Sequence, residues 1–153
     1  MYDIDYDILA QQAGELAETE PWYVAVMSNL SSLIMNSLNE LNWAGFYLIR
    51  DDKLVVGPFQ GKPACISIPV GKGVCGTAVR EDKMQVVPNV HEFPGHIACD
   101  SASESEIVIP IHHEGRIMAV LDIDSVVRDR FSEKDAAGLE AVVKVIEQKI
   151  SWK

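Results

Sequence analysis

The stretch EIVIPIHHEGRIMAVLDID, residues 106–124, decides the fold of this chain. It holds two apolar runs, 106–112 and 117–124, on either side of the turn pair Glu114-Gly115. Such runs, rich in isoleucine and valine and joined through a glycine-containing turn, are typical of an antiparallel β-hairpin. We therefore predict two neighbouring antiparallel strands over this stretch.

Working outward, the same kind of pattern predicts further strands upstream, and apolar residues at helical spacing predict helices near both ends. The further strand candidates are 43–49, 54–56, 65–70 and 85–87. The helix candidates are 7–18, 22–41, 74–80 and 132–153. Their order predicts an α+β fold. A central antiparallel sheet of about six strands would carry the N- and C-terminal helices on one face and irregular loops over the other.

The length of the chain is that of one domain. At 153 residues and 48% hydrophobic composition, it can bury a single sizeable core. We expect one domain over 1–153, with N-terminal helices in 1–41, the sheet and its loops in 42–131, and a C-terminal helix in 132–153.

The charge and hydropathy of the chain exclude several classes of partner. The formal net charge of −10 argues against binding to nucleic acid or to anionic membranes, whose phosphates would repel this surface. No apolar run approaches the ~18 residues that a membrane span needs. The acidic start MYDIDYDILA lacks the basic region of a secretory signal. We therefore expect a cytoplasmic location, where reducing conditions disfavour permanent structural disulfides.

Three cysteines lie in irregular segments. Cys65 and Cys75 are in glycine-punctuated stretches, and Cys99 lies in the polar segment VHEFPGHIACDSASESE, residues 90–106, which has neither helical nor strand periodicity. A zinc site made of these thiols and His91 or His96 is one interpretation. Structural zinc sites usually contain paired ligands at C-x2-4-C spacing, and this sequence has no such pair, so zinc is disfavoured.

Two other interpretations of the thiols are inert burial and redox catalysis. A free cysteine often behaves as a small buried hydrophobe. In redox catalysis, one thiol would attack an oxidised substrate and a second would resolve the product as a disulfide, which a cellular dithiol would then reduce. An odd number of cysteines in a reducing compartment favours transient or catalytic use.

The alternation of side chains along the predicted strands gathers polar and aromatic groups on one face of the sheet. These are Trp43, Tyr47, Glu106, Asp122 and Asp124. The simplest interpretation is that the acids are solvated and the aromatic residues pack in a core. The segment 83–105 is long enough to cover this face, however. Acids enclosed in this way would need a cation or protons.

Three strings indicate a family. IPVGKGVCG (68–76), VHEFPGHIACDSASESEIVIPI (90–111) and VLDIDS (120–125) closely resemble the free methionine-(R)-sulfoxide reductases, which are built on a GAF domain. The resemblance extends from about Asn42 to Ile146. Two small departures lie outside the motif cores: Asn89 replaces an aspartate that is usual before Val-His, and Val126 replaces a proline that often follows DIDS.

The resemblance implies reduction of free L-methionine-(R)-sulfoxide by attack of Cys99 on sulfur, with Cys65 and Cys75 as recycling cysteines. An intramolecular disulfide would form, and thioredoxin would reduce it, with no metal and no other cofactor. Family members are often homodimers. The matching pocket residues are Trp43, Tyr47, Glu106, Asp122 and Asp124. The alternative is a GAF-type sensor that binds a small molecule or responds to redox state without chemistry, which the lack of an output domain after the last helix disfavours.

The residues suggest how such a reaction would run. Glu106 and one of Asp122 or Asp124 would pair with the substrate ammonium, backbone N–H groups would bind its carboxylate, and Trp43 would contact its methyl group. Glu106 or Asp124, kept neutral by its neighbours, would protonate the departing oxygen. The acids near Cys99 should raise its pKa, which a protonated His96 would offset. Cys65 is slightly favoured as the first resolving cysteine.

Overall fold

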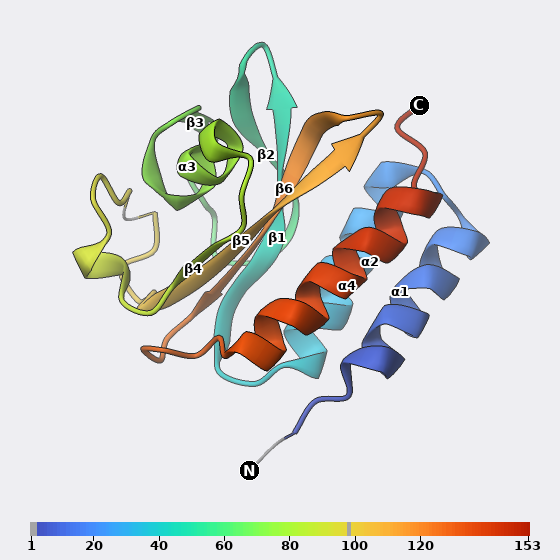
Figure 1. The fold of residues 1–153 in the computed structure, drawn as a ribbon, viewed down its shortest axis with the longest axis horizontal. Helices are drawn as coiled ribbons and strands as arrows, with labels where there is room; N and C mark the ends of the chain where they lie inside the picture. The colour runs from blue at the N-terminus through green and yellow to red at the C-terminus, as the bar shows by residue number, and fades with distance from the viewer. Residues whose placement is uncertain (1–2, 98) are drawn as a thin grey trace.

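One antiparallel sheet organises the molecule (Figure 1). A computed structural model describes residues 3–97 and 99–153. Within them the strands are β1 (Leu41–Arg50), β2 (Lys53–Gly61), β3 (Ser67–Pro69), β4 (Gln85–Val87), β5 (Ser105–His113) and β6 (Arg116–Ser125). They lie in the order β3-β2-β1-β6-β5-β4. The predicted hairpin forms β5 and β6, and β6 pairs with β1 at the middle of the sheet.

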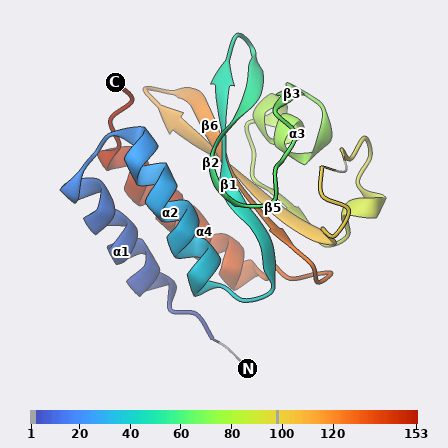
Figure 2. The same ribbon diagram turned by 180° about the vertical axis from the view of Figure 1, so that it is seen from behind.

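The helices divide between the two faces of the sheet. They are α1 (Tyr6–Thr19), α2 (Tyr23–Ser37), α3 (Gly73–Glu81) and α4 (Glu133–Lys149). The first face is covered by α2 and α4, and α1 packs on the outer side of this pair (Figures 1 and 2). The opposite face carries α3, and the segment between β4 and β5 lies on that side too, with a short 3-10 turn at Val90–Glu92. The predicted α+β architecture, with the terminal helices on one face, is confirmed.

Strand alternation creates two separate apolar cores. Ala44 and Phe46 of β1 point toward the terminal helices, together with the isoleucines of β5. Trp43 and Tyr47 point to the other face, where they join the second core with α3. Glu106 pairs with Asp124 in the register of β5 and β6 and is on this second face. The predicted division of side chains between the faces is therefore correct.

The strand β2 is longer than predicted. The predicted strand ended at Val56, yet β2 continues through Gly57 and Pro58 to Gly61. The register with β1 shifts so that Gly57 and Pro58 together lie opposite Phe46. This is a β-bulge, where the missing N–H of a proline does not interrupt the ladder.

The strand β3 is shorter than the predicted 65–70. It lies at the edge of the sheet and pairs only with residues 53–55 of β2. Cys65 lies outside the ladder, and its carbonyl oxygen accepts a hydrogen bond from the Tyr47 hydroxyl at 2.8 Å. The Tyr47 hydroxyl thus satisfies the Cys65 carbonyl oxygen, which has no partner on a neighbouring strand among the described residues.

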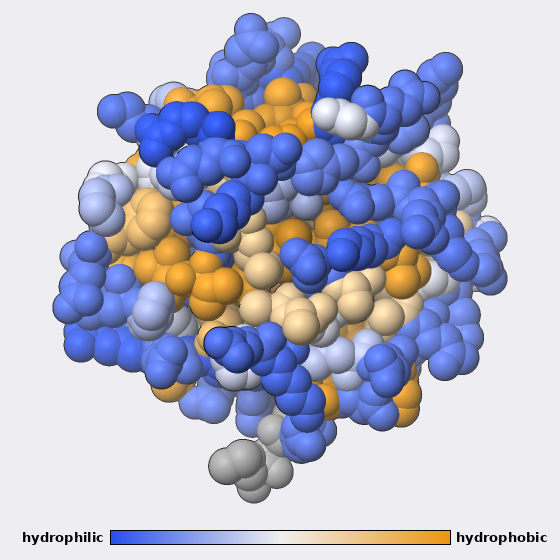
Figure 3. Space-filling model, viewed as in Figure 1, coloured by the Kyte–Doolittle hydropathy of each residue, from blue (hydrophilic) through white to orange (hydrophobic). Residues whose placement is uncertain are grey.

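The surface is consistent with the acidic composition. The face seen in Figure 3 is mostly hydrophilic, as expected for a chain with a net charge of −10. Among the residues that the structure describes, every helix is too short or too polar to span a bilayer.

Candidate active site

A disulfide joins Cys65 and Cys99 over the second face of the sheet. The two cysteines are 34 residues apart, and their Cα atoms lie 5.4 Å apart. This separation is in the usual range for a disulfide. Cys65 belongs to the connection between β2 and β3, and Cys99 to the connection between β4 and β5. The bond therefore ties two loops together above the sheet.

A cavity of about 40 Å³ lies beneath these loops. Seven of the eight predicted site residues line it, namely Trp43, Tyr47, Cys75, Cys99, Glu106, Asp122 and Asp124. The eighth, Cys65, is bonded to Cys99. The segment between β4 and β5 contributes His96 and Ile97 to the cavity wall as well as Cys99, so it covers this face as expected.

Three carboxyl groups meet at the bottom of this cavity. Glu106 comes from β5, and Asp122 and Asp124 come from β6; the exposed fractions of Glu106 and Asp122 are only 7% and 5%. Burial raises the pKa of Glu106 well above its usual value, and the charges of the two aspartates raise it further. Burial and the Asp122 charge likewise raise the pKa of Asp124. The acids are therefore enclosed rather than solvated.

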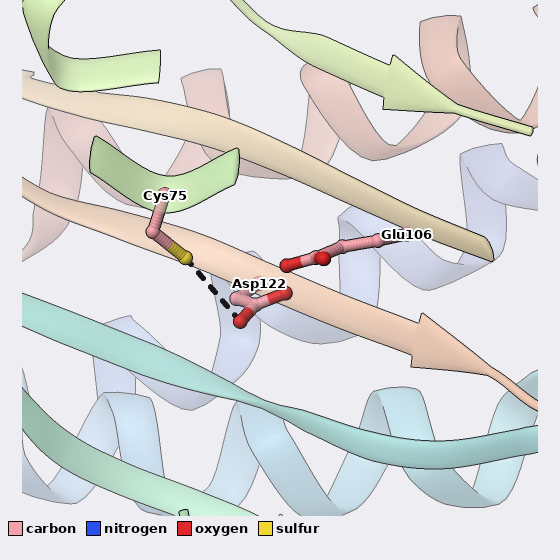
Figure 4. Close-up of side chains that lie close together, drawn as sticks. All are labelled: Cys75, Glu106 and Asp122. Carbon is pink, nitrogen blue, oxygen red and sulfur yellow. Dashed lines mark hydrogen bonds between the residues drawn. The ribbon is translucent and has the colours of Figure 1, made fainter. Parts of the chain in front are cut away.

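Asp122 differs from its two neighbours because it accepts a hydrogen bond from the Cys75 thiol. Burial raises its pKa, but the surrounding donors, including the Cys75 thiol, counteract this rise. The Cys75 Sγ lies 3.3 Å from the Asp122 Oδ2 (Figure 4). We therefore assign the negative charge of the cluster to Asp122 and the protons to Glu106 and Asp124.

Cys75 is a free thiol in this form. It is buried on α3, and burial together with the neighbouring carboxylates raises its pKa well above the usual value for a thiol. A thiol of this kind is a poor nucleophile because little of it is ionised. The sequence predicts Cys75 as a recycling cysteine; the structure places it beside Asp122, in the same cavity as Cys99 but outside the disulfide.

An aromatic stack forms one wall. The ring of Trp43 lies parallel to that of Phe59, with centroids 5.1 Å apart, and close to that of Tyr47, at 5.9 Å. The Trp43 Nε1–H donates to the carbonyl oxygen of Lys62 at 3.1 Å, which fixes the indole. Gly45 makes room for the stack, because a Cβ there would overlap Phe59. Sequence reasoning missed Phe59, because the bulge in β2 changes which face of the sheet its side chain points to.

Sequence reasoning also missed Asn42, a polar residue that contacts the segment after Cys99. The Asn42 Nδ2–H donates to the Asp100 Oδ2 at 2.9 Å and to the Ser103 Oγ at 3.0 Å. Hydrogen bonds from the Ala102 N–H and from Asn42 lower the pKa of Asp100, so this carboxylate is ionised. Of the acids expected to surround Cys99, Asp100 is therefore an ionised neighbour in the sequence, whereas the pKa of Glu106 is raised.

The two loop histidines have different surroundings. Burial lowers the pKa of His96, which lines the cavity, so this ring is mainly neutral at neutral pH. It is then unsuited to offset the acids around Cys99. His91 pairs with Glu104 through Nε2 and Oε2 at 2.5 Å. The zinc ligand set considered from the sequence is not available in this form, because two of its three sulfurs are bonded to each other.

Comparisons with known proteins identify the family of this chain. A family model described as GAF domain matches residues 25–151. The free methionine-R-sulfoxide reductase of Escherichia coli (strain K12) is 50% identical over 146 residues, which cover 95% of this chain and 86% of that protein. The chain belongs to the GAF-domain family of free methionine-R-sulfoxide reductases. The family indicated by the three sequence strings is confirmed.

Solved structures of a relative have the same fold. The reduced form of fRMsr of Staphylococcus aureus is 51% identical and superposes with a TM-score of 0.94, covering 97% of both chains. The same protein in complex with its substrate is 50% identical, with a TM-score of 0.93 over 99% of each chain. The GAF fold with its six-stranded antiparallel sheet is thus common to this chain and a relative that binds substrate.

Proposed function

We propose that this protein reduces free L-methionine-(R)-sulfoxide to methionine, with Cys99 as the nucleophile. The observation that carries the proposal is the Cys65–Cys99 disulfide at a cavity lined by an indole and three carboxyl groups, of which those of Glu106 and Asp122 are buried. Such a disulfide is the expected product when an attacking thiol is oxidised and a second thiol resolves it. The reductase activity stated for the Escherichia coli relative supports the same substrate.

The cavity offers a partner for each end of a free amino acid. The ammonium would pair with Asp122, the carboxyl group that retains the negative charge. The carboxylate would lie at the start of α3, where Gly73 and Val74 line the cavity and no side chain caps the helix. Helix N-termini bind anions through free N–H groups and the helix dipole. A peptide-bound methionine sulfoxide lacks both charges and would be excluded.

The chemical step transfers the sulfoxide oxygen to Cys99. The Cys99 sulfur attacks the sulfoxide sulfur, Glu106 or Asp124 donates a proton to the oxygen, and methionine leaves while Cys99 becomes a sulfenic acid. Both carboxyl groups have raised pKa values, as a proton donor at neutral pH requires. The methyl group of the substrate would lie against Trp43.

Resolution and recycling complete the cycle. The Cys65 thiol attacks the sulfenic sulfur of Cys99, water leaves, and the disulfide forms. Two electrons from a dithiol of the thioredoxin class, in a reducing cytoplasm, then restore both thiols. Since the cavity of the disulfide form measures only about 40 Å³, we expect substrate to enter after this reduction.

The test of the activity is NADPH consumption coupled through thioredoxin and thioredoxin reductase. We expect turnover with free methionine-R-sulfoxide and none with the S epimer or with the N-acetylated compound. The variant Cys99→Ser should lose turnover by at least about a thousandfold, the scale on which removal of a covalent nucleophile acts. Absence of turnover with every sulfoxide would contradict the proposal and favour a non-catalytic sensor.

The role of the resolving cysteine requires a separate measurement. Cys65→Ser should still release one methionine per protein molecule in a single turnover, but should lose thioredoxin-dependent multiple turnover. Cys75→Ser is the matched control, because the Cys75 thiol donates a hydrogen bond to Asp122 and forms no disulfide with Cys99. Loss of multiple turnover in Cys75→Ser, with Cys65→Ser unaffected, would assign resolution to Cys75 instead.

A further inference from the structure

Cys75, Glu106 and Asp122 point toward one another from α3, β5 and β6 (Figure 4). One ligand atom from each lies within 4.8 Å of the other two, and all three residues are buried. The Cys75 Sγ and Asp122 Oδ2 are 3.3 Å apart. In a tetrahedral zinc site with a Zn–S distance of about 2.3 Å and a Zn–O distance of about 2.0 Å, these two atoms would be about 3.5 Å apart. The observed spacing is close to that of two ligands of one ion.

A second observation points to a ligand at this place. Asp122 is only 5% exposed, and its Oδ1 has no hydrogen-bond partner among the described residues. The Asp124 Oδ1 also has no hydrogen-bond partner among the described residues. A buried carboxylate oxygen without a partner is unfavourable, and either a cation or a proton removes the cost. The hydrogen bond from Cys75 to Asp122 leaves this Oδ1 unsatisfied.

We propose that Cys75, Glu106 and Asp122 form a binding site for a zinc-class divalent cation that blocks the substrate cavity. One thiolate and two carboxylates suit Zn²⁺ and its relatives, whereas Mg²⁺ and Ca²⁺ prefer oxygen ligands alone. The Cys75 thiol and the Glu106 carboxyl group would each release a proton on binding, and water would complete the coordination. The ion is inhibitory and not a cofactor for turnover.

The ion and the substrate would compete for the same carboxylate. The proposed function places the substrate ammonium at Asp122, so the competition rests on that proposal. Binding of the cation itself does not, because it depends only on the three side chains. The disulfide form is suited to this binding, since the sulfurs of Cys65 and Cys99 are joined and Cys75 is the remaining thiol.

The experiment titrates the disulfide-bonded protein with Co²⁺, a spectroscopic substitute for Zn²⁺. We expect one ion per chain, a thiolate-to-cobalt charge-transfer band in the near ultraviolet, and loss of the band when Zn²⁺ is added. Cys75→Ser should abolish the band, and Asp122→Asn should weaken binding at least tenfold. Asp82→Asn is the matched control, because this exposed aspartate bonds to His112 outside the cavity, and it should bind as the unaltered protein does.

The outcomes separate the site from the activity. A band that survives in Cys75→Ser, or the lack of any band in the unaltered protein, would overturn the cation site regardless of turnover. If Cys75→Ser fails to fold, Asp122→Asn carries the test through its Co²⁺ affinity alone. In the reduced protein, where substrate can enter the cavity, L-methionine should raise the apparent dissociation constant for Co²⁺ in proportion to its concentration. Unchanged Co²⁺ affinity in saturating methionine would overturn the overlap with substrate.

Discussion

At the scale of single residues, the chemistry of this site depends on three neighbouring carboxyl groups that have little contact with solvent. Glu106, Asp122 and Asp124 cannot all be ionised at low cost in a buried cluster. Hydrogen bonding to Asp122 selects which group keeps the charge. In the proposed reaction, the cavity would therefore supply one carboxylate to pair with the substrate ammonium and two carboxylic acids that can donate a proton to the sulfoxide oxygen.

The raised pKa of Glu106 predicts a pH-dependent stability. Between its usual value of 4.5 and its raised value in the folded protein, the folded state keeps a proton that the unfolded chain releases. The contribution of Glu106 to the free energy of unfolding should thus be largest below pH 4.5. It should fall as the pH rises toward the pKa of Glu106 in the folded protein. Glu106→Gln should remove this contribution, because an amide does not titrate. Each tenfold difference in proton affinity between the folded and unfolded states corresponds to about 1.4 kcal/mol.

Urea unfolding of both proteins at pH 5 and pH 8 measures the effect. The decline from pH 5 to pH 8 should be smaller in Glu106→Gln than in the unaltered protein. Glu114→Gln, at a side chain that is 83% exposed, serves as the control and should leave the decline unchanged. Equal declines in all three proteins would show that Glu106 is not a buried acid with a raised pKa.

At the scale of elements, the site depends on helices on both faces of the sheet. The α3 helix brings Cys75 to the carboxyl cluster, and α4 packs under β5 from the other side. A capping box begins α4: the Ser132 Oγ accepts from the Asp135 N–H at 3.2 Å, and Asp135 accepts from the Ser132 N–H at 2.9 Å. The sequence predicted this cap from the spacing of the two residues.

Removal of the cap gives a prediction about stability. Ser132→Ala should lower the free energy of unfolding by about 1 kcal/mol, because the first turn of α4 loses a hydrogen-bond acceptor. The exposed Ser67→Ala on β3 is the control and should change it by less than about 0.5 kcal/mol. Chemical denaturation at one pH compares the three proteins, and an equal effect of the two substitutions would contradict the role of the cap.

At the scale of the whole molecule, the proposed recycling requires that a reducing partner can reach the disulfide. Ile66 follows Cys65 directly and is 74% exposed, and Val70 nearby is 40% exposed. Large apolar side chains exposed together are common at protein interaction surfaces. We expect a thioredoxin-class protein to contact this surface when it reaches the Cys65–Cys99 bond.

Ile66→Asp should therefore slow reduction of the disulfide by thioredoxin without slowing reduction of the sulfoxide. The catalytic efficiency with thioredoxin should fall about tenfold, the effect of losing about 1.4 kcal/mol of binding. Turnover driven by dithiothreitol should stay within about twofold, because a small dithiol needs no docking surface. Val86→Asp, at a 41% exposed residue on β4, is the control at the opposite edge of the sheet. An equal loss with both reductants would place the effect in the cavity rather than at the surface.

The sequence by itself determined the α+β order and which strand faces carry the acids, because both follow from local periodicity along single strands. It also predicted the capping box and the site residues that reach the cavity, the latter through alternation and family-specific strings. These features need no information about distant residues.

Tertiary structure alone decided the rest, because it depends on contacts between distant parts of the chain. The pairing of Cys65 with Cys99 and the contact of Cys75 with Asp122 each join loops or elements that only folding brings together. The bulge around Pro58 likewise requires the register of β1 against β2. Burial then fixed the charge of each carboxyl group, since a pKa depends on neighbours and solvent that local sequence does not specify.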